Sequence, residues 1–171
     1  EGILTNIAGT INIAERCKKY NVAEMVLIST DKAVNPFSVM GVTKRISEKY
    51  CQSLAGTSQT NFKIVRFGNV LGSTGSVVPL FQKQLEKGGP LTVTHPKMKR
   101  YFMTVREAVE LVIQSATLEN KTKKSGIFVL EMGHPIAIVE IAEQLIKLAG
   151  LRPNKDIKIN FTGLRPGEKI L

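Results

Sequence analysis

Three adjacent polar residues, Thr30, Asp31 and Lys32, lie just after the short apolar run Met25–Ile28. A carboxyl group beside an amine can act as an acid–base pair, because one group gives a proton and the other takes one. The apolar run is typical of a parallel strand that is buried on both faces. Ligands of open α/β sheets bind at the carboxyl ends of the strands, so the pattern predicts a reaction site at such an edge.

A second cation, Lys44, belongs to a helix that we expect to begin after Ser38, a residue type favoured at helix N-caps. Met40 lies four residues before Lys44, so the two side chains share one face of this helix. The apolar residues of the helix form a stripe that faces elsewhere, the pattern of an amphipathic helix. This stripe consists of Val39, Val42, Ile46 and Tyr50.

Helix and strand patterns alternate along the chain, which implies right-handed crossovers and a parallel sheet. We therefore predict an α/β fold. The expected helices are 2–19, the helix after Ser38, 77–86, 105–118 and 138–149, the last ending at Gly150. The expected strands are 25–28, 62–67, 91–94, 100–104, 127–131 and 157–161.

The composition excludes several classes of protein. With 171 residues, 43% of them hydrophobic, the chain can bury a substantial core. No apolar run approaches the roughly 18 residues of a membrane span, and the N-terminus lacks the plan of a signal peptide. The two cysteines, Cys17 and Cys51, are far apart and form no C-x-x-C motif, which excludes a disulfide scaffold or a zinc ribbon and suits a reducing cytoplasm. Because the chain opens at Glu1 in a helical pattern, we expect it to be a piece of a longer protein.

The formal net charge of +10 requires an anionic partner or an acidic part of the protein outside this sequence. Nucleic acid is one such partner, but the basic residues are scattered and few aromatic residues lie among them. The clusters are Lys97, Lys99 and Arg100, and Lys121, Lys123 and Lys124. We therefore expect no nucleic-acid partner. His95 and His134 each precede a proline, which is typical of turn residues, and they predict no metal site.

An ordered set of motifs covers nearly the whole chain and resembles the extended short-chain dehydrogenase/reductases. Within that class the resemblance is to nucleotide-sugar 4,6-dehydratases that act on UDP-N-acetylglucosamine in bacterial capsule, O-antigen and protein-glycan synthesis. The matching motifs are Asn6 with Gly9-Thr10, Ser29–Pro36, Met40–Arg45, Arg66–Gly72, Ser76–Phe81, Thr92–Pro96, Arg100–Thr104 and Arg165–Lys169.

The sequence also departs from this family. The G-x-G-x-x-G dinucleotide fingerprint and its ribose-binding acidic residue are absent, because the sequence matches the family only from a point after them. Where the family usually has a tyrosine four residues before the helix lysine, this chain has Met40. The resemblance is thus to a subgroup with this methionine, whose members often carry a membrane anchor ahead of the dehydratase domain. We expect the fragment to be inactive alone.

The resemblance implies NAD as cofactor, rather than NADP, and a reaction that removes water from the sugar across C5 and C6. It assigns Lys32 as the base that takes the C5 proton and Asp31 as the acid for the leaving C6 hydroxyl. A thioether is a weak acceptor, so Met40 cannot take the C4 hydroxyl proton, and Thr30, Asp31 or a water must relay it. Lys44 is expected to bind the nicotinamide ribose and to favour hydride transfer by its charge.

The resemblance also assigns binding residues and domains. The cofactor-binding residues are Lys44, Ser29, Asn6, Phe67, Gly68 and Val70. The substrate-binding residues are Asn69, Val77, Val78, Thr92, Val93, Arg100, Arg165 and Glu168, with the arginines on the diphosphate. We expect a partial Rossmann-type parallel sheet in residues 1–78 and 101–132, the NAD-binding domain. Residues 79–100 and 133–171 are expected to form a smaller α/β domain that binds the UDP-sugar. We further expect a homo-oligomer in the cytoplasm, or at the cytoplasmic face of the inner membrane if the protein is anchored.

Other functions remain open. A UDP-sugar 4-epimerase or a dehydratase that inverts C5 would share most of these motifs, although the absent tyrosine argues against an ordinary epimerase. A basic nucleotide- or nucleic-acid-binding domain without catalysis is a third alternative. In that case Thr30, Asp31 and Lys32 would be a solvated strand end, and Arg100 and Arg165 would be surface charges.

Overall fold

The computed structural model describes residues 1–73, 75–118 and 125–171. The predicted basic cluster Lys121, Lys123 and Lys124 lies outside the described residues. The chain divides into two compact units, each of which it enters twice. Unit 1 is Glu1–Phe67 with Arg106–Glu131, and unit 2 is Gly68–Val105 with Met132–Leu171. Residues 68–78, 101–105 and 132, which the sequence places with the first domain, thus belong to unit 2.

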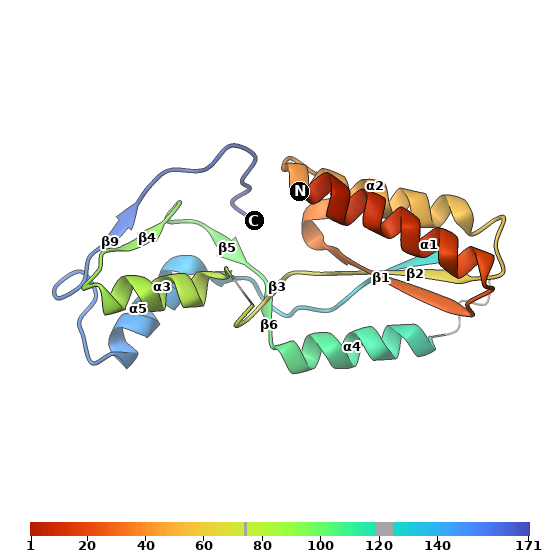
Figure 1. Cartoon of the computed structure of the whole chain (residues 1–171). Coiled ribbons are helices and arrows are strands. Elements are labelled where there is room, and N and C mark those ends of the chain that lie inside the picture. Colours follow the sequence, from red (N-terminus) through yellow and green to blue (C-terminus); the bar gives the residue numbers. More distant parts are fainter. Residues whose placement is uncertain (74, 119–124) are drawn as a thin grey trace. The chain divides into compact units, whose positions relative to one another are not determined.

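Unit 1 contains a parallel sheet in the order β1-β2-β7, as the alternation of helices and strands predicts. Its strands are β1 (Glu24–Thr30), β2 (Asn61–Phe67) and β7 (Ser125–Val129). Helices α1 (Gly9–Lys19) and α2 (Val39–Leu54) cover one face, and α4 (Val105–Thr117) covers the other (Figure 1). In the register of β1 and β2, Ser29 lies opposite Arg66 and Thr30 lies opposite Phe67.

The central strand β2 is buried on both faces, as expected for a parallel strand between helix layers. Phe62 and Ile64 pack with Leu27, Cys51 and Ala14, residues of β1, α2 and α1. The helix predicted over residues 2–19 begins with a π-helical segment, η1 (Ile3–Ala8), which runs into α1. Such π-helical turns shift the side chains that follow around the helix axis.

Helix α2 begins where the sequence predicts, because the Ser38 Oγ accepts a hydrogen bond from the Gly41 N–H at 3.2 Å. The apolar stripe of this helix is, however, not its packing face. Val39, Val42 and Ile46 are exposed in this chain. The buried face is small or polar and consists of Gly41, Thr43, Ser47, Glu48, Cys51 and Leu54. Small side chains let α2 approach η1 closely: the Ser47 hydroxyl donates to the Asn6 carbonyl at 2.6 Å.

The described residues of unit 2 form three pairs of short strands and two helices. Parallel pairs join β3 (Asn69–Val70) to β6 (Phe102–Met103) and β4 (Leu91–Val93) to β9 (Ile159–Phe161). An antiparallel pair joins β5 (Lys99–Arg100) to β8 (Ile136–Ala137), so the strand predicted over 100–104 is two strands that meet different partners.

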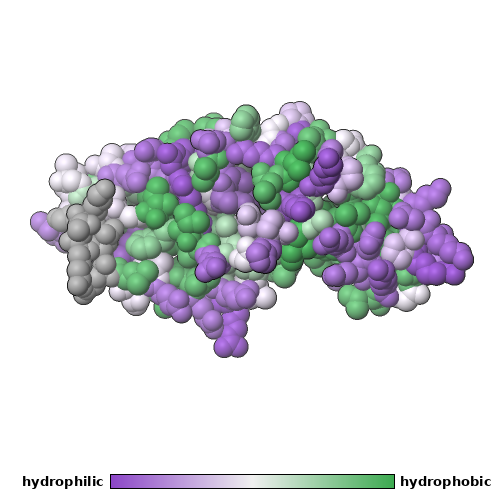
Figure 2. All heavy atoms as spheres, turned by 180° about the vertical axis from the view of Figure 1, so that it is seen from behind, coloured by the Kyte–Doolittle hydropathy of each residue, from purple (hydrophilic) through white to green (hydrophobic). Residues whose placement is uncertain are grey.

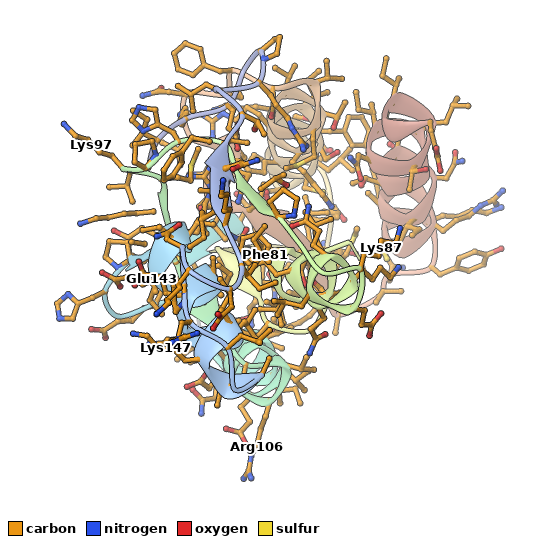
Figure 3. The ribbon with its side chains drawn as sticks, turned by 90° about the vertical axis from the view of Figure 1, so that its left-hand side faces the viewer. Phe81, Lys87, Lys97, Arg106, Glu143 and Lys147 are labelled. Carbon is orange, nitrogen blue, oxygen red and sulfur yellow. The ribbon has the colours of Figure 1, made fainter. Side chains whose placement is uncertain are left out.

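The core of unit 2 lies between its helices and the pair β4-β9. Helices α3 (Val77–Glu86) and α5 (Ile138–Leu148) bury Phe81, Ala142 and Ile146 against Leu91 and Val93 of β4. Figure 3 shows Phe81 in the interior, whereas Lys97 extends away from it. Gly150 has φ 75°, which confirms it as the residue that ends α5.

Candidate active site

The acid–amine pair lies in a single turn at the end of β1. The turn is a 3₁₀ segment, η2 (Asp31–Ala33), and the Thr30 Oγ1 accepts a hydrogen bond from the Lys32 N–H at 3.3 Å. The same hydroxyl donates to Asp31 Oδ1 at 2.8 Å, and the Lys32 Nζ lies 3.0 Å from that oxygen. Both charged side chains are about one-third exposed, at 32% for Lys32 and 29% for Asp31. The three residues therefore form one hydrogen-bonded group that a ligand can reach.

Lys44 reaches the same end of β1 from α2. Its Nζ donates to the Ile28 carbonyl at 3.1 Å, two residues before Thr30. Partial burial lowers the pKa of Lys44 from its ordinary value of 10.5, because a desolvated ammonium is less stable. Met40, one turn earlier, is exposed, and its carbonyl accepts from the Thr43 hydroxyl at 2.8 Å.

The residues predicted to bind the cofactor fall into both units. Lys44, Ser29, Asn6 and Phe67 belong to unit 1 and Gly68 and Val70 to unit 2. The Asn6 Nδ2 donates to Thr43 Oγ1 at 3.0 Å, and the Ser29 Oγ donates to Glu48 Oε1 at 2.6 Å. Both side chains thus bond to α2.

Gly68 needs to be a glycine for reasons of space. A Cβ at this position would lie 2.9 Å from the Tyr101 carbonyl oxygen and 3.1 Å from the Met132 sulfur. The Gly68 N–H donates to that sulfur at 2.8 Å. The start of unit 2 is therefore packed through its backbone, and Val70 follows in β3.

Unit 2 contains a pocket of about 400 Å³. Of the eight residues predicted to bind the substrate, all but Val78 line it. They are Asn69, Val77, Thr92, Val93, Arg100, Arg165 and Glu168. These residues come from five separate parts of the sequence, so the fold brings together most of a set that only the family resemblance had connected.

The charged residues of the pocket form a hydrogen-bonded cluster. Glu168 Oε1 accepts from Thr94 Oγ1 at 3.2 Å and lies 3.7 Å from the Arg100 Nη2. Glu168 Oε2 accepts from the Arg165 backbone N–H at 3.1 Å. Arg100 also donates to the carbonyls of Lys169 and Ile170, at 2.8 and 3.0 Å. Arg100 therefore holds the C-terminal segment that carries Arg165 and Glu168, a role the sequence did not predict.

Sequence reasoning missed Ser76, the N-cap residue of α3. Ser76 lines the pocket, and its Oγ is buried and has no hydrogen-bond partner among the described residues. The free N–H groups at a helix N-terminus attract anions. The signal in the sequence was a serine directly before a predicted helix. Thr94, Thr162 and Ser73 also line the pocket.

In the parts of the chain that the structure describes, no group of three or more His, Cys, Asp or Glu side chains could hold a metal ion. None of the helices in those same residues combines the length and the apolar character needed to cross a membrane. Cys17 and Cys51 are free thiols, and burial raises the pKa of Cys51 to about 11, which makes it a poor nucleophile.

The parallel sheet, the polar turn at its edge and the separate pocket define an α/β protein of the extended short-chain dehydrogenase/reductase class. The chain belongs to the family described as polysaccharide biosynthesis protein, whose model matches residues 1–171. The resemblance to extended short-chain dehydrogenase/reductases of bacterial polysaccharide synthesis is therefore confirmed.

Relatives with assigned names support the same family. The chain is 56% identical over 171 residues to "Capsular polysaccharide biosynthesis protein CapD" of Staphylococcus aureus, covering 99% of this chain and 28% of that protein. It is 54% identical over 170 residues to "Probable polysaccharide biosynthesis protein EpsC" of Bacillus subtilis, with 99% and 28% covered. A "UDP-glucose 4-epimerase" of Rickettsia canadensis is 37% identical over 172 residues, with 99% and 48% covered. The chain thus spans less than a third of the first two relatives.

Solved structures share the fold. Pen from Bacillus thuringiensis matches with a TM-score of 0.85 at 36% identity, covering 98% of this chain and 51% of that one. The dTDP-glucose 4,6-dehydratase of Bacillus anthracis, solved in complex with NAD, matches with a TM-score of 0.80 at 21% identity, covering 96% and 58%. The predicted α/β fold with a Rossmann-type parallel sheet is confirmed.

Proposed function

We propose that the protein to which this chain belongs dehydrates UDP-N-acetylglucosamine to a 4-keto-6-deoxy UDP-sugar for the synthesis of a bacterial capsule, O-antigen or protein glycan. The observation that carries the proposal is the Asp31–Lys32 contact of 3.0 Å at the end of β1, with Lys44 bonded to the same strand. Membership of the polysaccharide biosynthesis family supports it. So does the fold shared with a nucleotide-sugar 4,6-dehydratase.

The residues of unit 1 fit NAD at the nicotinamide end. A lysine ammonium has three N–H donors, and the bond from Lys44 to the Ile28 carbonyl uses one of them. The remaining donors suit the hydroxyls of the nicotinamide ribose. When bound there, NAD would supply hydride transfer from sugar C4 and back to C6. Lys44 contributes a positive charge beside that transfer.

We assign the proton transfers to residues of the turn η2. Lys32 takes the C5 proton, which the C4 ketone makes acidic, and Asp31 gives a proton to the C6 hydroxyl as it leaves as water. The Lys32 Nζ and Asp31 Oδ1 are 3.0 Å apart, close enough for a proton to pass between them. One proton moved from Lys32 Nζ to Asp31 Oδ1 along their contact yields a neutral amine and a neutral acid, the form that the elimination needs. Thr30 donates to Asp31 Oδ1, and we assign to it the relay of the C4 hydroxyl proton that Met40 cannot accept.

Binding of the nucleotide part falls to the pocket of unit 2. Arg100 and Arg165 supply guanidinium groups for the diphosphate, and Glu168 supplies a carboxylate for the uridine ribose. Thr92 and Val93 lie on β4, which we assign to the uracil ring. The lining combines two arginines and several hydroxyl and amide side chains with one carboxylate and apolar residues. The two guanidinium groups suit an anionic nucleotide.

The test follows the C5 hydrogen of the substrate in the complete protein. With UDP-N-acetylglucosamine and NAD in deuterated water, mass spectrometry should show a product lighter by one water and deuterium at C5. Lys32→Ala should abolish the exchange. Lys97→Ala, at a lysine that points away from the protein in Figure 3, is the matched control and should leave it unchanged. Normal C5 exchange by Lys32→Ala would remove Lys32 from the role of base.

A UDP-sugar 4-epimerase is the second candidate, supported by the relative that bears that name. The same experiment separates the two, because an epimerase product keeps the mass of the substrate. A dehydratase that inverts C5 gives the same mass change with the opposite C5 configuration, which NMR coupling constants resolve. Salt-dependent binding to DNA of arbitrary sequence, without turnover, would instead support a non-catalytic basic domain.

We also infer that the protein forms a homo-oligomer through α2. The stripe Val39, Val42 and Ile46 is exposed, together with Phe37, which is 72% exposed just before the helix. Apolar side chains lie at the surface among polar ones in Figure 2 as well. Contiguous exposed apolar surface is costly unless something covers it. Light scattering should show a dimer or larger oligomer that Ile46→Glu dissociates.

A further inference from the structure

A fully buried carboxylate, Glu48, lies on α2 one turn after Lys44. Its Oε1 accepts hydrogen bonds from the Ser29 Oγ at 2.6 Å and from the Arg66 Nε at 2.7 Å. Its Oε2 accepts from the Arg66 Nη2 at 2.5 Å and from the Arg45 Nη1 at 3.1 Å. One carboxylate therefore takes donors from three elements of unit 1.

These donors tie together the carboxyl ends of two neighbouring strands. Ser29 on β1 lies opposite Arg66 on β2 in the sheet register. The Arg66 guanidinium donates two parallel hydrogen bonds to the Glu48 carboxylate. Burial by itself would raise the pKa of Glu48. The hydrogen bonds from Arg66, Ser29 and Arg45 and the charge of Arg66 outweigh it and lower that pKa below its ordinary value, so the group stays ionised.

The same strand end carries the reacting groups. Lys44 bonds to Ile28 and Glu48 bonds to Ser29, so two successive residues of β1 are held by two residues one turn apart on α2. The next residues along the chain are Thr30, Asp31 and Lys32. The position of Ser29 therefore determines how Asp31 and Lys32 are oriented at the end of β1.

We propose that Glu48 is a positioning residue of this site: through Ser29 and Arg66 it fixes the turn that carries Asp31 and Lys32 relative to Lys44. The inference rests on the proposed function for the reaction that the turn performs. The geometry that it describes can be tested without that reaction.

A role in stability alone accounts poorly for Glu48. A buried ion pair adds little net stability, and apolar side chains of similar volume often do as well or better. The carboxylate instead fixes the orientation of its neighbours, because its two oxygens accept hydrogen bonds from donors at defined positions. The same two strands carry a comparison pair at their other end, Glu24 on β1 and Lys63 on β2, with 2.6 Å between Nζ and Oε2.

Amide hydrogen exchange of the full chain tests the geometry. The Lys32 N–H is bonded to Thr30 Oγ1 and the Val34 N–H to the Asp31 carbonyl, so their exchange reports on the turn. Glu48→Gln keeps the size of the side chain and removes its charge. It should raise exchange at these two amides by about 10-fold or more, since the bond to Ser29 weakens. Ser29→Ala, a smaller change that removes only that bond, should give the same local effect if Glu48→Gln does not fold.

Glu24→Gln is the matched control. It alters an ion pair between the same strands at the opposite end of the sheet. It should lower overall stability without changing the relative exchange of the Lys32 and Val34 amides. The positioning role is overturned if folded Glu48→Gln and Ser29→Ala exchange these amides at the wild-type rate.

Kinetics of the complete protein then separate the inference from the proposed function. Glu48→Gln should lower kcat by about 10- to 100-fold, because a small displacement of a reacting group is that costly, and should leave KM for the UDP-sugar within about twofold. Unchanged kcat in a variant with a loosened turn would refute the positioning role while the dehydratase function stands. A loosened turn in a protein whose wild type neither dehydrates the sugar nor exchanges C5 would refute the function and leave the geometry intact.

Discussion

A methyl group at position 41 would lie 2.3 Å from the carbonyl oxygen of Lys32, so Gly41 allows α2 to lie directly against the turn that carries the acid and the amine. Real Cβ atoms do not approach an oxygen this closely. The Pro36 Cβ, at 3.1 Å, closes the other side of the same space. The glycine thus sets how near the turn Asp31–Ala33 can lie to the helix that carries Lys44.

Gly41→Ala should therefore displace the turn and reduce both stability and activity. Overpacking of a closed site costs roughly 1–3 kcal/mol, which urea denaturation will measure. We expect kcat to fall more than KM rises, since the displaced groups are those of the reaction. Gly56→Ala is the control, because a Cβ there meets nothing within 4 Å, and it should change stability by about 0.5 kcal/mol or less.

The pKa of Lys44 predicts a pH dependence. Burial lowers this pKa in the folded protein, so the unfolded chain binds more protons at pH values between the folded and the ordinary pKa of 10.5. Above pH 10.5 Lys44 is neutral in both forms, and its burial carries no penalty. As the pH falls through the folded pKa, the folded protein loses stability, because the desolvated amine must take up a proton. Stability of the wild type should rise relative to Lys44→Met as the pH increases toward 10.5. Urea midpoints of both proteins at pH 7 and pH 10 measure this. A difference that stays constant with pH would show that Lys44 is not desolvated.

Much of unit 1 could be predicted from the sequence, because the residue patterns that indicate its elements are local. The apolar run before Thr30 predicts β1, and Ser38 predicts the start of α2. The three polar residues at the strand end are adjacent in the chain, so their contact follows from the strand ending there.

The packing face of α2 could not be predicted from the sequence, because the burial of its polar residues depends on partners that are distant in the chain. Glu48 is buried only because Arg66 and Ser29, each 18 or 19 residues away in the sequence, supply donors. Apolar periodicity instead points to Val39, Val42 and Ile46, which are exposed in this chain. The bonds from Arg100 to the carbonyls of Lys169 and Ile170 likewise join residues about 70 positions apart and leave no local pattern.

The ion pair between exposed Glu24 and buried Lys63 gives a prediction about stability. The Lys63 side chain is 4% exposed, whereas Glu24 is 37% exposed, and the Lys63 Nζ also donates to the Ala116 carbonyl near the end of α4. Glu24→Gln leaves an ammonium that water cannot reach, at a cost of roughly 1–3 kcal/mol. Lys63→Met should cost less, because Glu24 can turn to solvent and the apolar chain fills the space. Denaturation of both variants in urea checks the order, and the reverse order would show that the pair is hydrated.

Arg165 provides the sharpest test of the pocket in unit 2. It is exposed and lines the pocket beside Glu168, whose Oε2 accepts from the Arg165 backbone rather than from its guanidinium. If that guanidinium binds the diphosphate, Arg165→Glu replaces a charge-assisted bond by repulsion. KM for the UDP-sugar should then rise by about 10- to 100-fold, while kcat changes little.

The matched control is Arg106→Glu. Arg106 is exposed, pairs with Glu110 along α4, and points away from the protein in Figure 3. Arg106→Glu changes the net charge by the same amount as Arg165→Glu. Comparing the two variants therefore separates the loss of a local contact from a general loss of attraction for an anion. Equal increases of KM in the two variants would mean that the overall charge, and not this pocket, draws the nucleotide to the protein.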